Sequence, residues 1–77
     1  MPQVTANLYA MLRAHAGGAS SVDATIEPGQ TVEQLLVQLK IPVEQTRIIF
    51  CNNRHVDLSH PLQGGETVGI FPAIGGG

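Results

Sequence analysis

Residues 31–40, TVEQLLVQLK, decide the fold class of this chain. Thr31 is followed three residues later by Gln34, which is the capping-box pattern of a helix N-terminus. The apolar residues of the segment are spaced i, i+3, i+4 and i+7, as on one stripe of an amphipathic helix. They are Val32, Leu35, Leu36 and Leu39. Pro42 marks the expected helix end, and so short a helix must pack against a sheet to be stable.

The segments on both sides of this helix have strand patterns. Residues 4–9 (VTANLY) and 22–27 (VDATIE) alternate between apolar and polar, which predicts half-buried strands. After the helix, residues 47–52 (RIIFCN) are a continuous apolar run of strand type, and residues 67–71 (TVGIF) alternate again. Residues 55–56 are expected to form a short strand at most.

The remaining segments are rich in glycine, proline and small polar residues. Residues 14–21 (AHAGGASS), 28–30 (PGQ) and 61–67 (PLQGGET) are therefore predicted as turns and loops. The order strand, strand, helix, strand, short strand, strand is that of the β-grasp fold. We expect an α+β roll in which one main helix packs on one face of a mixed sheet of four to five strands. The predicted domain spans residues 1–71, and residues 72–77 form a flexible tail.

The strand and helix patterns share one phase, which predicts a single core. Its expected members are Val4, Leu8, Ile26, Val32, Leu35, Leu36, Leu39, Ile49, Val68 and Ile70. Tyr9 and Phe71 then lie on the opposite face of the sheet. In a chain with only three aromatic residues, two outward aromatics suggest an anchor for a partner. The alternative is that they are isolated exposed apolar side chains.

Composition excludes several classes of function. The 77 residues carry four Lys and Arg and a net charge of −2, unlike the basic patch of a nucleic-acid-binding protein. No apolar stretch approaches the ~20 residues of a membrane span, and no signal peptide is visible, so a cytoplasmic protein is expected. Cys51 is the single cysteine, which leaves no intramolecular disulfide.

The side chains offer no convincing catalytic or metal site. His15, His55 and His60 lack ligand spacing and are expected at the surface. Cys51 lies in a predicted strand among apolar neighbours and is expected to be a small buried side chain. We therefore predict that the chain is not an enzyme by itself and binds no metal or cofactor.

The C-terminal segment FPAIGGG, residues 71–77, is the remaining candidate for chemistry. Gly75, Gly76 and Gly77 have no Cβ, so this tail could thread a narrow channel in a partner, and Pro72 would stiffen its root. An ATP-dependent partner could activate the Gly77 carboxylate as an acyl-adenylate. The alternative is a frayed terminus without function.

Three segments resemble the ubiquitin-like sulfur carriers of the MoaD and ThiS family, with MoaD the better match. They are LYAMLRAHAG (8–17), TVEQLL (31–36) and HPLQGGETVGIFPAIGGG (60–77), the last of which is the most specific. The family often has Pro-Pro after the strand aromatic, where this chain has Pro72-Ala73. The resemblance covers essentially the whole chain.

The resemblance implies a function for the tail. A MoeB- or ThiF-like enzyme would adenylate Gly77 with ATP and magnesium, and a sulfur donor would convert it to a thiocarboxylate. The carrier would then deliver sulfur to the large subunit of a molybdopterin synthase or an equivalent acceptor enzyme. The implied partner-binding residues are Tyr9, His55, Phe71, Pro72 and Ile74.

Several alternatives stay open at this stage. The sulfur could serve thiamine, as with ThiS, another sulfur-containing metabolite or a tungsten cofactor. The same activated terminus would also suit a ubiquitin-like protein modifier. A β-grasp interaction module with an idle tail is the third possibility.

Overall fold

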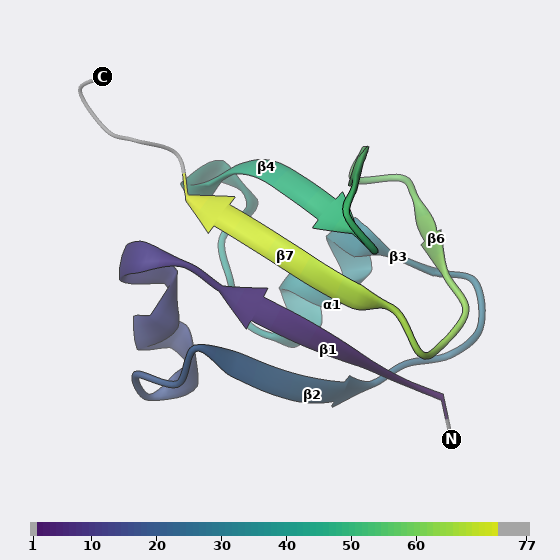
Figure 1. The fold of residues 1–77 in the computed structure, drawn as a ribbon, viewed down its shortest axis with the longest axis horizontal. Coiled ribbons are helices and arrows are strands. Elements are labelled where there is room, and N and C mark those ends of the chain that lie inside the picture. The colour runs from purple at the N-terminus through teal and green to yellow at the C-terminus, as the bar shows by residue number, and fades with distance from the viewer. Residues whose placement is uncertain (1, 73–77) are drawn as a thin grey trace.

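The computed structural model describes residues 2–72, which form one mixed five-stranded sheet with the strand order β2-β1-β7-β4-β5 (Figure 1). The strands are β1 (Gln3–Leu8), β2 (Ser21–Thr25), β4 (Thr46–Cys51), β5 (Arg54–Val56) and β7 (Thr67–Pro72). β1 and β7 are parallel, whereas the other three pairs of neighbouring strands are antiparallel. β7, the last strand within residues 2–72, therefore lies at the centre of the sheet. The predicted α+β architecture is confirmed.

The helix α1 (Val32–Gln38) begins with the predicted capping box. The Gln34 backbone N–H donates to Thr31 Oγ1 at 3.2 Å, and the Thr31 N–H donates to Gln34 Oε1 at 3.0 Å. The helix ends earlier than Pro42 predicts. Lys40 already has a φ of 63°, outside the range of a right-handed helix.

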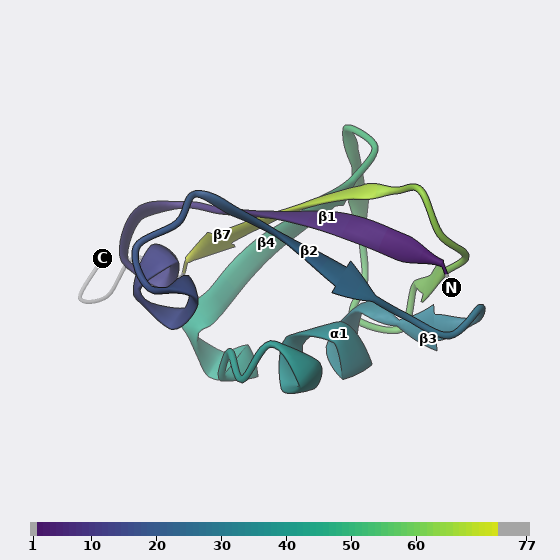
Figure 2. The same ribbon diagram turned by 90° about the horizontal axis from the view of Figure 1, so that it is seen from below.

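One face of the sheet is covered and the other is open. α1 lies across one face, and within residues 2–72 no helix covers the opposite face (Figure 2). We call this opposite side the open face. Two short strands, β3 (Gln30–Thr31) and β6 (Pro61–Leu62), form a separate antiparallel pair next to the start of α1. Residues 61–62 are thus paired, although the sequence predicts a loop there.

A second helix corrects the prediction for residues 14–21. The 3-10 helix η1 spans Ala10–Ala16, so only its continuation from Gly17 is a turn. Leu12 points into the core and is fully buried, which gives this short helix its tertiary support. Gly17 has a φ of 64° and forms the C-cap, so the glycine ends a helix here rather than preventing one. A shorter 3-10 helix, η2, spans Val43–Gln45.

The core lies between the sheet and α1 and matches the predicted set closely. Every predicted member is buried except Leu39, the C-cap of α1, which packs against the core while partly exposed. Cys51 is buried, as expected from its strand position. The apolar core residues not included in the prediction are Ala6, Leu12, Ala24, Ile41 and Leu62.

Candidate functional site

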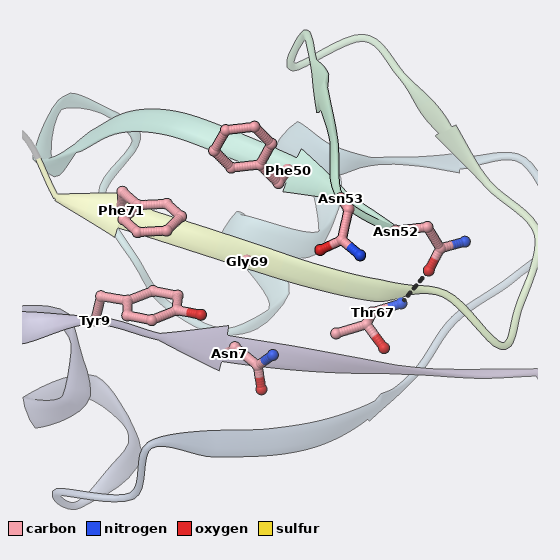
Figure 3. A pocket seen from close by; sticks show the side chains of 8 residues that line it. All are labelled: Asn7, Tyr9, Phe50, Asn52, Asn53, Thr67, Gly69 and Phe71. Atoms are coloured by element: carbon pink, nitrogen blue, oxygen red, sulfur yellow. Dashed lines mark hydrogen bonds between the residues drawn. The ribbon is translucent and has the colours of Figure 1, made fainter.

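All three aromatic side chains of the protein gather on the open face (Figure 3). The rings of Tyr9 and Phe71 are stacked, with centroids 4.2 Å apart and an angle of 5° between their planes. Phe50 meets Phe71 edge to face, at 5.7 Å and 81°. We call Tyr9, Phe50 and Phe71 the aromatic cluster. Because the whole aromatic content of the chain lies on one uncovered surface, this surface is the strongest candidate for partner binding.

The sheet register brings these rings together. Leu8 pairs with Ile70 in the parallel strands β1 and β7, so the residues that follow, Tyr9 and Phe71, are neighbours on the other face. Directly after Tyr9, Ala10 has a φ of 53°, and the chain turns from β1 into η1. The aromatic pair therefore sits where β1 ends and beside the end of β7.

The prediction that Tyr9 and Phe71 point away from the core is confirmed. Tyr9 is 41% exposed and Phe71 is half-buried, whereas the neighbouring Leu8 and Ile70 are buried in the core. Phe50 was not predicted as part of this surface, because residues 47–52 form one continuous apolar run in the sequence. In this strand Ile49 and Cys51 are buried in the core, and Phe50 lies between them on the opposite face. Alternation from these two residues could have placed Phe50 on the open face.

A hollow lies beside the aromatic cluster, and Gly69, which is buried, belongs to its lining. Gly69 pairs with Phe50 across β4 and β7. A Cβ at Gly69 would lie 3.7 Å from both Phe71 Cε1 and Tyr9 Cε2, which is ordinary contact. The hollow is open to solvent and continues along β7 away from the rings. Its lining consists of Asn7, Tyr9, Phe50, Asn52, Asn53, Thr67, Gly69 and Phe71 (Figure 3).

His55 adjoins the aromatic cluster, as the resemblance implied. Its ring centroid lies 5.9 Å from that of Phe50, at an angle of 53°, and the residue pairs with Phe50 between β4 and β5. His55 is exposed and is not part of the hollow lining. It therefore extends the candidate surface toward β5.

The remaining predicted site residues lie at or beyond the end of β7. Pro72 is the last residue of β7 and pairs with Thr46, so the strand extends one residue past the predicted domain boundary. Ile74, Gly75, Gly76 and Gly77 lie outside the described residues, and their roles stay predictions. The aromatic cluster is adjacent to the root of this tail, because Phe71 directly precedes Pro72.

Other reactive side chains are separated from this surface. Burial, together with the nearby Glu66 charge, raises the pKa of the Cys51 thiol, which keeps this thiol in its less nucleophilic neutral form. His15 donates to or accepts from Gln45 at 2.9 Å, on the side of η1 and η2. Within residues 2–72, no group of three or more His, Cys, Asp or Glu side chains is arranged to hold a metal ion. No helix in that part of the chain has the length and apolar character of a membrane span.

The turn before β7 is fixed by one carboxylate. Burial alone would raise the pKa of Glu66, but backbone N–H groups of Gln63 and Gly64 donate to its oxygens at 2.8 and 2.6 Å. These donors hold the pKa of Glu66 below its ordinary value. Gly64 is required here because its φ is 125° and a Cβ would lie 2.7 Å from Pro2 Cβ. The turn thereby sets the start of the strand that carries Gly69 and Phe71.

Solved structures share this fold over nearly the full length of both chains. A Pyrococcus furiosus protein described as molybdopterin converting factor subunit 1 is 23% identical, with a TM-score of 0.76, and the match covers 96% of this chain and 100% of that one. The small archaeal modifier protein 1 of Haloferax volcanii is 17% identical, with a TM-score of 0.78 and the same coverages. A chain in the BexX/CysO complex of Amycolatopsis orientalis is 28% identical, with a TM-score of 0.66, and the match covers 96% and 99% of the two chains. The predicted β-grasp, ubiquitin-like fold is confirmed.

A family model identifies the chain more directly than these structures do. No curated protein matches the sequence. The model of the ThiS family, however, matches residues 7–77, which include the aromatic cluster, β7 and the terminal glycines. The predicted relation to the MoaD and ThiS carriers is thereby confirmed. This chain belongs to the ThiS family of ubiquitin-like sulfur carriers.

Proposed function

We propose that the chain carries sulfur as a thiocarboxylate on Gly77 and donates it in the biosynthesis of molybdopterin. The observation that carries this proposal is the ThiS-family match, which extends through the terminal glycines. The likeness to molybdopterin converting factor subunit 1 favours molybdopterin as the pathway. The chain itself supplies the terminal carboxylate, and its partners supply ATP, magnesium and the catalytic groups.

The proposed chemistry has two steps on one carboxyl group. In the first, an oxygen of the Gly77 carboxylate attacks the α-phosphorus of ATP in a MoeB- or ThiF-like enzyme, and pyrophosphate leaves. In the second, a sulfide sulfur attacks the carbonyl of the acyl-adenylate. A C–S bond forms, the C–O bond to the phosphate breaks, AMP leaves and a proton is released. No atom changes its oxidation state when the donor is sulfide.

In this proposal the partner binds the surface next to the tail. The six residues from Pro72 to Gly77 span at most ~20 Å when extended, so an enzyme that takes up Gly77 must lie against the end of β7. Tyr9 and Phe71 are large apolar side chains at that end, as is the exposed Ile48, which pairs with Phe71, and His55 borders the same surface. We assign docking to Tyr9, His55 and Phe71 together with Pro72 and Ile74.

ATP–pyrophosphate exchange tests the activation step. The full chain, incubated with a MoeB- or ThiF-like enzyme of its source organism, should support exchange of labelled pyrophosphate into ATP. A variant that lacks Gly76 and Gly77 should fold as the parent does and support no exchange, because its carboxylate cannot reach the α-phosphorus. Equal exchange with both chains would refute the assignment to Gly77.

The second candidate function is protein modification. It is favoured by the fold shared with the small archaeal modifier protein 1 of Haloferax volcanii. In that case a lysine amine of a target protein, instead of sulfide, would attack the activated carbonyl. Conjugates that are larger than the chain, seen by intact-mass analysis of cell extracts, would favour the modifier. A chain that gains only one sulfur in place of oxygen would favour the carrier.

Pathways other than molybdopterin biosynthesis could also receive the sulfur. The structural match within the BexX/CysO complex leaves room for a carrier that serves another sulfur-containing metabolite, and the family match leaves room for thiamine. Transfer of labelled sulfur from the thiocarboxylate to each purified acceptor enzyme with its own precursor distinguishes these routes. Our proposal predicts transfer with the molybdopterin synthase large subunit.

A further inference from the structure

The strand β4 contains one extra residue opposite the end of β7. Ile48 pairs with Phe71, but the next pair joins Thr46 to Pro72, so the register skips Arg47. Such a β-bulge bends the strand and increases its twist, and bulges commonly re-aim the residues beside them. This bulge lies at the root of the tail, where the start of β4 meets the end of β7 (Figure 1).

The bulge determines which way Thr46 faces. In an unbroken strand, alternation would place residue 46 on the open face with Ile48, and would bury residue 47 with Ile49. The extra residue instead leaves the charged Arg47 exposed, and it turns the half-buried Thr46 to the side of its partner Pro72. Because Pro72 follows Phe71 in the strand, this is the covered side of the sheet.

The Thr46 side chain is tied to η2 on that side. Its Oγ1 donates to the Val43 carbonyl at 2.6 Å in a partly buried hydrogen bond, and the Thr46 backbone N–H donates to the same carbonyl. The Val43 side chain in turn packs against the core while partly exposed. Pro72 has no N–H and cannot donate a ladder hydrogen bond, so its placement relies on the residue beside it. The hydroxyl therefore connects the root of the tail to the core through η2.

The root of the tail matters for a reaction at its far end. Gly77 lies five residues beyond Pro72, at most ~17 Å away along the chain. Once a partner has docked on the domain, bringing the terminal carboxylate to the reacting atom is an intramolecular step. The rate of such a step depends on how few orientations the connecting chain can take. A less restrained root would slow this step without removing the docking contacts.

We infer that Thr46 is a positioning residue for the reaction of Gly77. Its hydroxyl holds the start of β4 on η2, and together with the bulge at Arg47 it fixes the position of Pro72, from which the tail extends. Thr46 acts through Pro72 and not through the reacting atoms. This inference rests on the proposed function, since it takes Gly77 as the reacting residue. It adds a residue outside both the tail and the aromatic cluster that sets the rate.

A purely structural role for the same hydrogen bond makes a different prediction. If the Thr46 hydroxyl only stabilised the end of η2, its loss would lower the melting temperature and leave the reaction of the folded chain unchanged. Thr31→Ala supplies the matched control, because it also removes a threonine hydroxyl that bonds to the backbone, at the start of α1. Both variants are compared well below their melting temperatures.

Steady-state ATP–pyrophosphate exchange with the MoeB- or ThiF-like enzyme tests the inference. Thr46→Val keeps the branched shape and favours a strand but removes the hydroxyl. We expect its kcat to fall roughly fivefold, since one more backbone residue must be ordered during the reaction, with the KM for the chain within about twofold of the parent. Thr46→Ser retains the hydroxyl and should restore kcat. Thr31→Ala should keep both parental constants.

Hydrogen exchange of the free chain locates the effect. The amide of residue 46 should exchange faster in Thr46→Val than in the parent, because the end of η2 has loosened. The amide of Phe50, which pairs with Gly69 beyond the bulge, should exchange at the parental rate. A fall in kcat without faster exchange at residue 46 would refute the route through β4.

The outcomes separate this inference from the proposed function. An inactive parent chain would refute the proposed function. With an active parent, a folded Thr46→Val that keeps kcat within about twofold would overturn the inference alone. A rise in KM with unchanged kcat would overturn it as well, as would an equal loss of kcat in Thr31→Ala. If Thr46→Val does not fold, Thr46→Ala decides by the same criteria.

Discussion

Replacing Phe71 by alanine should weaken docking while the domain stays folded. The change removes the stack on Tyr9 and the edge contact with Phe50, each worth about 0.5–1.5 kcal/mol, so the free energy of unfolding should fall by about 1–3 kcal/mol. A domain of this size then melts roughly 4–20 °C lower but stays folded at room temperature. If Phe71 is an anchor, binding to the adenylating enzyme loses at least about 1–2 kcal/mol, or roughly 5- to 30-fold in affinity.

Thermal unfolding of the chain measures its loss of stability. Calorimetric titration of the chain into the adenylating enzyme measures its loss of affinity. Val37→Ala is the matched control, because Val37 is 68% exposed on α1, on the opposite side of the molecule, and should leave the affinity unchanged. Parental affinity of folded Phe71→Ala, measured well below its melting temperature, would refute the assignment of the open face to docking. Equal weakening by both variants would refute it as well.

Three further predictions concern the fold. Leu36→Ala should cost about 2–5 kcal/mol in urea unfolding because Leu36 is fully buried, and a parental midpoint would contradict the core assignment. Thr31→Ala removes the capping box and should cost about 1 kcal/mol in the same assay, while Glu33→Gln nearby should change little. Since folding lowers the pKa of Glu66, its stabilisation is present above the ordinary carboxyl pKa and is lost as pH falls through the lowered value. Glu66→Gln should flatten this acid-side loss in melts across pH.

Local patterns predicted the parts of the fold that depend on near neighbours. The capping box at Thr31 and the apolar stripe after it specify α1, and alternation specifies which face of β1 and β7 is buried. These signals succeed because side-chain periodicity follows directly from backbone geometry. The order of strands in the sheet depends on pairing between distant segments, and nothing in the period of β7 shows that it lies at the centre.

Tertiary contacts explain the elements that were missed. Residues 10–16 are mostly good helix formers, but the segment is short and two glycines follow it, so the sequence did not mark a helix there. Leu12 inserts into the core and Gly17 caps the turn, and these contacts make η1 a helix. The pair β3–β6 is similar, since its two-residue strands are too short to produce a pattern.

The candidate site was predictable in part. The outward positions of Tyr9 and Phe71 follow from alternation, which is a local property. Their stacking, the contribution of Phe50 and the hollow over Gly69 arise from the register between β1, β7 and β4. A one-residue change of register would move Phe50 away from Gly69, so the sequence of one strand alone could not define the hollow.

The most direct test of the central claim is the intact mass of the full chain after reaction with ATP, magnesium, the adenylating enzyme and sulfide. We predict a gain equal to the difference between one sulfur and one oxygen atom, located in the C-terminal peptide that contains Gly77. The gain should be absent without ATP and absent in the chain that lacks Gly76 and Gly77. An unchanged mass of a parent chain that supports ATP–pyrophosphate exchange would contradict the sulfur-carrier account, as would the same gain in the truncated chain.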